Sequence, residues 1–216
     1  MFEDSDRKWG EVEDDFLVFI LDTKEKEWID GRIKKRIREM VCDEGGLEEC
    51  FEVILRILGA KIQEKNEEKK LIFFMEELNN IEAMYTKGVM QSIGYKEFVE
   101  LFRKEAKMVF EEEKKFSKFS EKMKKRASEI AKEYDSNTLL KQSVDKLAKD
   151  TIMLTKKQRK WIKNRIYTVP ELNKKSFLFY VKSKEQFFEE ILPKAKNILD
   201  DYLSGKKSIE VLNDEY

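Results

Sequence analysis

Apolar residues recur at helical spacing along most of this chain, and this pattern constrains the fold more than any other feature. Ile29, Ile33, Ile37 and Val41 stand four positions apart and form one stripe of a predicted helix. Only 8 glycines and 2 prolines occur among 216 residues, so long helices meet few interruptions. The same reasoning predicts helices over residues 24–42, 47–58, 67–85, 138–165 and 183–203. The sequence therefore predicts a mainly α-helical fold.

Two short apolar runs break the helical pattern. Residues 16–21 form a continuous aromatic and aliphatic run, and residues 176–181 read SFLFYV. Runs of this length and composition are typical of buried β-strands, so we expect one or two short strands within the mainly α fold. No apolar run approaches the ~18 residues of a membrane span, and we expect no membrane partner.

The residue types that carry common catalytic and metal chemistry are scarce. The chain has no histidine, and Cys42 and Cys50 do not form a CxxC pair. The commonest general base and the commonest zinc ligand are therefore absent, and a reducing compartment is expected. No GxxxxGK[ST] phosphate loop occurs, since residues 204–207 match it only in part. These observations point to no certain catalytic residue and to no metal site.

Charge is abundant but balanced. The chain carries 44 basic and 44 acidic residues, so any nucleic-acid surface must be local. Arg32 and Arg36 stand one helical turn apart, and two guanidinium forks at this spacing could grip a diphosphate. The alternative is a solvated helix face on which Asp30 and Glu39 are the ion-pair partners. The residues alone leave both interpretations open.

Two further segments could bind RNA. Residues 88–98 read GVMQSIGYKEF, a glycine-bounded loop whose Tyr95 and Lys96 could stack on a base and bind the backbone. Residues 156–165 hold six basic residues, with Gln158 and Trp161 between them. The alternatives are an ordinary interhelical loop and a basic helix whose Trp161 packs into the core.

Taken together and in this order, the three features resemble the tRNA dimethylallyltransferase family. GVMQSIGYKEF is similar to that family's Gly-x-x-Gln-x-Ile-Gly-Tyr/Phe-Lys-Glu-Phe segment. The family's Thr-Arg-x-Tyr-Ala-Lys-Arg-Gln-x-x-Trp-Ile motif is matched by Thr151, Lys156, Gln158, Trp161 and Ile162. Its upstream motifs are matched by Arg32-Ile33, Arg36-Ile37, Met40 and Gly46–Glu49.

The chain also departs from the family pattern. Ile152 and Lys157 stand where the family has arginines, and lysine keeps the charge without the bidentate fork. The family's phosphate loop and acidic base are not found in this sequence. We therefore expect a C-terminal part of the enzyme that is inactive alone. The alternatives are a truncated sequence, a split enzyme whose N-terminal half is a separate partner, and a decayed copy.

The resemblance implies transfer of a dimethylallyl group from dimethylallyl diphosphate to N6 of adenosine 37, beside the tRNA anticodon. It also implies Mg²⁺ for the complete enzyme and none bound by this chain alone. Arg32 or Arg36 would face the diphosphate. The anticodon stem-loop would contact Gln91, Ser92, Gly94, Tyr95, Lys96, Lys156, Lys157, Gln158, Trp161 and Lys163.

The implied fold is the helical C-terminal remainder of a phosphate-loop α/β transferase, in the cytoplasm or in mitochondrial or nuclear pools. We expect an acidic segment (1–15), a partial core (16–98), a charged and largely exposed helical insertion (99–137), a tRNA-contacting part (138–205) and a tail (206–216). The alternatives are a catalytically inactive tRNA- or RNA-binding helical protein and a helical scaffold whose resemblance is chance.

Overall fold

The computed structural model describes residues 17–81, 94–170 and 175–204. The chain forms two compact units. One, the helical unit, comprises Gly31–Met153. The other, the sheet unit, comprises the residues up to Asp30 together with those from Leu154 onward. Helix α1 (Lys26–Cys42) and helix α6 (Thr138–Ile162) each continue from one unit into the other.

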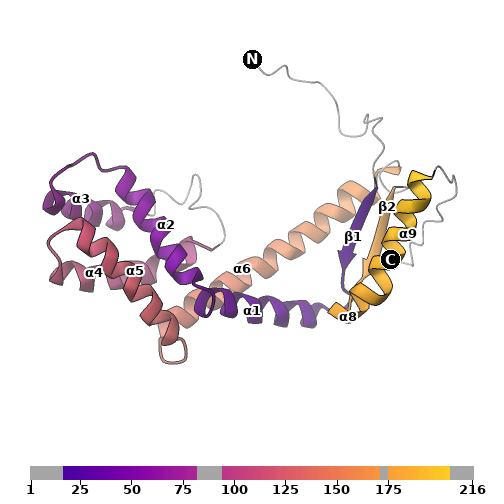
Figure 1. The fold of residues 1–216 in the computed structure, drawn as a ribbon, viewed down its shortest axis with the longest axis horizontal. Helices are drawn as coiled ribbons and strands as arrows, with labels where there is room; N and C mark the ends of the chain where they lie inside the picture. Colours follow the sequence, from indigo (N-terminus) through magenta and orange to yellow (C-terminus); the bar gives the residue numbers. More distant parts are fainter. Residues whose placement is uncertain (1–16, 82–93, 171–174, 205–216) are drawn as a thin grey trace, which may run out of the picture. The chain divides into compact units, whose positions relative to one another are not determined.

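Phenylalanine side chains form the centre of the helical unit. Its other described helices are α2 (Gly46–Ala60), α3 (Glu67–Asn79), α4 (Val99–Glu112) and α5 (Phe116–Lys132), labelled in Figure 1, and a 3₁₀ turn (Lys96–Phe98) precedes α4. Helix α5 packs against α2, α3 and α4. Ring centroids lie 4.9 Å apart for Phe51 and Phe102 and 5.4 Å apart for Phe74 and Phe119, and all four side chains are fully buried.

The segment expected to be a largely exposed insertion therefore supplies much of this core. Residues 99–132 form α4 and α5, and the break between them lies at residues 113–115. Phe102, Phe119 and Met123 face inward and are fully buried, while most of the charged side chains between them face solvent. Glu105 is buried and accepts a hydrogen bond from Arg126 at 2.8 Å. The high charge of this segment lies mainly on its outer faces, because one apolar stripe suffices to bury a helix.

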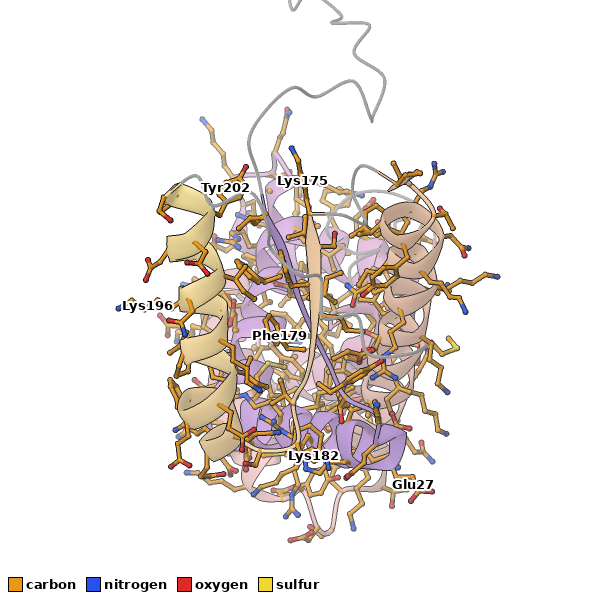
Figure 2. The ribbon with its side chains drawn as sticks, turned by 90° about the vertical axis from the view of Figure 1, so that its right-hand side faces the viewer. Glu27, Lys175, Phe179, Lys182, Lys196 and Tyr202 are labelled. Carbon is orange, nitrogen blue, oxygen red and sulfur yellow. The ribbon has the colours of Figure 1, made fainter. Side chains whose placement is uncertain are left out.

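A two-stranded parallel sheet organises the sheet unit. Strand β1 (Val18–Asp22) pairs with β2 (Ser176–Tyr180), in register from Val18 opposite Ser176 to Asp22 opposite Tyr180. After β2 come α8 (Lys184–Gln186), a π turn (Phe187–Ile191) and α9 (Leu192–Leu203). Figure 2 shows the two strands between α9 and the C-terminal part of α6, with Lys175 and Lys182 at opposite ends of β2.

The expected mainly α fold with two short strands is confirmed. Pro193 stands in the first turn of α9, directly after the π turn. A second π turn (Lys163–Tyr167) follows α6. Across the described ranges, every helix is too short or too polar to cross a membrane.

Candidate nucleic-acid interface

The C-terminal part of α6 presents a continuous cationic face to solvent. The exposed residues on this outer face are Lys156, Lys157, Gln158, Lys160 and Trp161 of α6, continued by Lys163, Asn164 and Arg165 of the π turn that follows. None of its lysines forms an ion pair with a carboxylate among the described residues. Their charge is not neutralised locally, which favours contact with a phosphate backbone. The predicted tRNA-contacting residues of this segment are therefore all exposed to solvent.

Trp161 lies on this outer face and not in the core. Its side chain is 54% exposed, which decides between the two positions that the sequence left open. A large apolar ring exposed among cations is unusual for a structural tryptophan, because burial of such a ring would stabilise the fold. An aromatic ring between phosphate-binding cations is the arrangement with which proteins stack unpaired RNA bases.

Arg159 is the one basic residue of this segment that turns inward, whereas the sequence counted it among six basic residues that could bind RNA. Its guanidinium Nη2 donates to the Asp22 carboxylate at the end of β1 and, at 3.1 Å, to the carbonyl oxygen of Thr23. Arg159 shares the half-buried stripe of α6 with Ile152, Thr155 and Ile162. The three- and four-residue spacing of this stripe was the signal that could have separated Arg159 from its basic neighbours.

The glycine-bounded segment 88–98, called the GYKEF loop below, is described from Gly94 onward. Hydrogen bonds and ion pairs of its own side chains and backbone hold this part against the helical unit. Gly94 has φ +116°, a conformation that side-chain-bearing residues rarely adopt, and its N–H donates to Glu97 Oε2 at 2.8 Å. Glu97 is buried, and the Lys96 ammonium lies 3.6 Å from its Oε1 and 3.7 Å from Asp150 Oδ2. Lys96 therefore links this loop to α6 while about a third of its side chain stays exposed.

Tyr95 is half-buried and packs against the core of the helical unit, so only part of its ring can face a ligand. Gln91 and Ser92, two further predicted tRNA contacts, lie outside the described residues.

The thiol of Cys50 reports on the anchoring of this loop. It donates to the carbonyl oxygen of Gly94 at 3.6 Å, and burial raises the pKa of Cys50 to about 12. Only about one Cys50 in 10,000 is then a thiolate at pH 8, and unfolding restores an ordinary pKa. We expect iodoacetamide to label half-buried Cys42 first and Cys50 only after denaturation, as peptide mass spectrometry would report. Equal labelling of both in the folded chain would contradict this anchoring.

Arg36, one of the two arginines expected to face the diphosphate, is already engaged. Its two terminal nitrogens pair with both carboxylate oxygens of Glu44, one of them at 2.9 Å, and Glu39 lies 3.9 Å away. The hydrogen bond from Arg36 lowers the pKa of Glu44 and raises that of Arg36. The chief partner is thus Glu44, whereas the sequence suggested Asp30 and Glu39. Because the pair is exposed, it adds little stability, and a diphosphate could displace Glu44.

Arg32 lies exposed on the same helix, α1. Arg36 and Lys96 belong to the helical unit, and Lys156–Lys163 to the sheet unit. Their meeting around one substrate therefore stays a prediction. Among the described residues, no three or more Cys, Asp or Glu side chains form a group able to hold a metal ion.

Comparison with known proteins gives the family of the chain. The model of the IPP transferase family matches residues 2–165, and the chain belongs to this family. Human tRNA dimethylallyltransferase is 25% identical over 180 residues, which cover 83% of this chain and 30% of the human protein. The mouse tRNA dimethylallyltransferase is 26% identical over the same shares. The chain thus spans about 30% of the length of these relatives. No solved structure matches it significantly.

Proposed function

We propose that this chain supplies the tRNA-binding part of an enzyme that transfers a dimethylallyl group to N6 of adenosine 37. The cationic outer face of α6 with its exposed Trp161 is the observation that carries the proposal. Its lysines bind backbone phosphates, and the indole ring stacks on an unpaired base of the anticodon loop. In the reaction, N6 bonds to the allylic carbon, the carbon–oxygen bond to diphosphate breaks, and N6 loses a proton.

Within this proposal, the arginines of α1 bind the departing diphosphate. Arg36 exchanges Glu44 for the diphosphate oxygens, with Arg32 one turn away. Gln91, Ser92, Gly94, Tyr95 and Lys96 contact the tRNA beside the reacting base. Mg²⁺, expected for the complete enzyme, would neutralise diphosphate charge there.

We also propose that a second polypeptide segment with the family's phosphate loop completes the enzyme. Parallel sheets in proteins are normally covered on both faces and rarely consist of two strands. Here Phe19, which packs on Phe177, is 37% exposed, and Leu21, two positions along β1 on the same face, is 54% exposed. Further strands and a covering helix beside β1 would bury both side chains.

Reconstitution tests this assignment. We expect the chain alone to bind an anticodon stem-loop but to form no prenylated adenosine from dimethylallyl diphosphate. Addition of a polypeptide with an IPP-transferase phosphate loop should yield the product, detected by mass spectrometry of digested nucleosides. The control is the same polypeptide with its loop lysine changed to alanine, which should give none. Full activity of the isolated chain would overturn the proposed division of labour.

The runner-up is a catalytically inactive RNA-binding protein, favoured by the lack of any certain catalytic residue beside a well-formed cationic face. Tight RNA binding without product in the reconstituted mixture would support this second function. Absence of RNA binding even at low salt would exclude both.

A further inference from the structure

One ion pair connects the cationic helix to the sheet. Asp22 is the last residue of β1, and its Oδ1 accepts hydrogen bonds from Arg159 Nη2 and, at 2.7 Å, from the N–H of Thr23. Arg159 Nη2 also donates to the Thr23 carbonyl oxygen, and Thr23 Oγ1 accepts from the N–H of Glu25. Arg159 thus donates hydrogen bonds to the side chain of Asp22 and to the backbone of Thr23 at the carboxyl end of the strand. We call this arrangement the Asp22–Arg159 clasp.

The clasp is partly shielded from water. About a quarter of each side chain remains exposed, 25% for Arg159 and 28% for Asp22. A charge-assisted bond in such a place is stronger and more directional than an ion pair in open solvent. The double attachment to Asp22 and Thr23 therefore restrains the guanidinium, and through it the turn of α6 that carries it.

The position of Arg159 along α6 gives this restraint a consequence. Successive residues of a helix are rotated by about 100°, so fixing Arg159 toward the sheet fixes the direction of every neighbour. Lys156, Lys157, Lys160 and Lys163 then all face solvent, with Trp161 among them. A rotation of α6 by a few tens of degrees would turn part of this set toward the sheet. The clasp therefore sets which side chains an RNA can reach.

We infer that Arg159 is a positioning residue for RNA binding, acting through the rotation of α6, and that it makes no phosphate contact of its own. This inference rests on the proposed tRNA-binding function and assigns Asp22 the matching role. Of the six basic residues in 156–165, five would contact the RNA, and Arg159 would hold them in the orientation that this contact needs.

The variant Asp22→Asn distinguishes a positioning role for Arg159 from a phosphate contact, because the two roles predict opposite changes in RNA affinity. The variant keeps the shape of the side chain, removes one negative charge and releases Arg159. If Arg159 were a phosphate contact, its release and the added positive charge would tighten RNA binding. If Arg159 positions α6, we expect affinity for the anticodon stem-loop to fall about 3- to 10-fold. The dependence of log K on log salt should stay unchanged, since the number of phosphates contacted is the same.

Two further variants complete the test. Arg159→Gln should weaken binding similarly, again without change in the salt slope, and the Asp22→Asn/Arg159→Gln double variant should lose no more than either single variant. Asp200→Asn, which removes an exposed acidic residue of α9, controls for the altered net charge and should leave affinity unchanged or slightly higher. All affinities are measured well below each unfolding midpoint, so that lowered stability alone would not change them.

The outcomes are distinct. Tighter or unchanged binding by Asp22→Asn overturns the inference, and so does a salt slope that falls by about one in Arg159→Gln. If the native chain binds no RNA, the proposed function fails. The clasp is then still tested by the unfolding midpoints, because additive effects of the two substitutions on stability would show that Arg159 does not depend on Asp22.

Discussion

Reversing two charges on the outer face of α6, by Lys156→Glu with Lys157→Glu, should lower affinity for the anticodon stem-loop roughly 100-fold at low salt. Both lysines are exposed and unpaired among the described residues, so each loses a favourable phosphate contact and gains a repulsive one. The slope of log K against log salt should fall by about two, since two fewer counterions are released. Titration of labelled stem-loop at several salt concentrations measures both quantities.

A matched control lies in the same unit of the protein. Lys194→Glu with Lys196→Glu changes the net charge equally on exposed residues of α9, and Figure 2 shows Lys196 on the side of α9 away from the strands. We expect this pair to change affinity by no more than about threefold, because scattered surface charge acts only at long range. Equal losses from both pairs would remove the outer face of α6 from the interface.

The helices and the cationic segment could be predicted from the sequence because both are local patterns. Four-residue spacing locates α1, and the density of lysines locates the C-terminal part of α6. The partners of these charges could not be predicted in the same way. Arg159 meets Asp22 across 136 intervening residues, and Arg36 takes Glu44 because the chain turns back after α1. Only the folded backbone brings such pairs together.

The burial or exposure of individual aromatic residues could not be predicted from the sequence either. Trp161 follows the inward-facing Arg159 by two positions, so it lies on the other side of the helix, but its own residue type favours the core. The parallel pairing of β1 with β2 joins strands separated by more than 150 residues. Neither strand's composition specifies that partner. The apolar stripe of residues 99–132 is visible in the sequence at helical spacing, but its place at the centre of the helical unit is not.

Two adjacent phenylalanines on α3 should differ sharply in their contribution to stability. Phe74 is fully buried, and its ring centroid lies 5.3 to 6.3 Å from those of Phe102, Phe116 and Phe119. Phe74→Ala should lower the free energy of unfolding by about 3–5 kcal/mol, because it removes a large buried side chain and leaves a cavity among rigid rings. A domain is usually stable by only about 5–15 kcal/mol, so this variant should be close to unfolding.

Phe73→Ala is the matched control, since it makes the same substitution one position earlier on the same helix. Phe73 is 45% exposed, beside Ile62 and charged side chains at the rim of a surface hollow, so its removal should cost less than about 1 kcal/mol. Urea denaturation followed by far-ultraviolet circular dichroism measures both variants. An equal decrease in the free energy of unfolding for the two variants would mean that α3 does not pack Phe74 against α4 and α5. The helical unit would then have a different core from the one described.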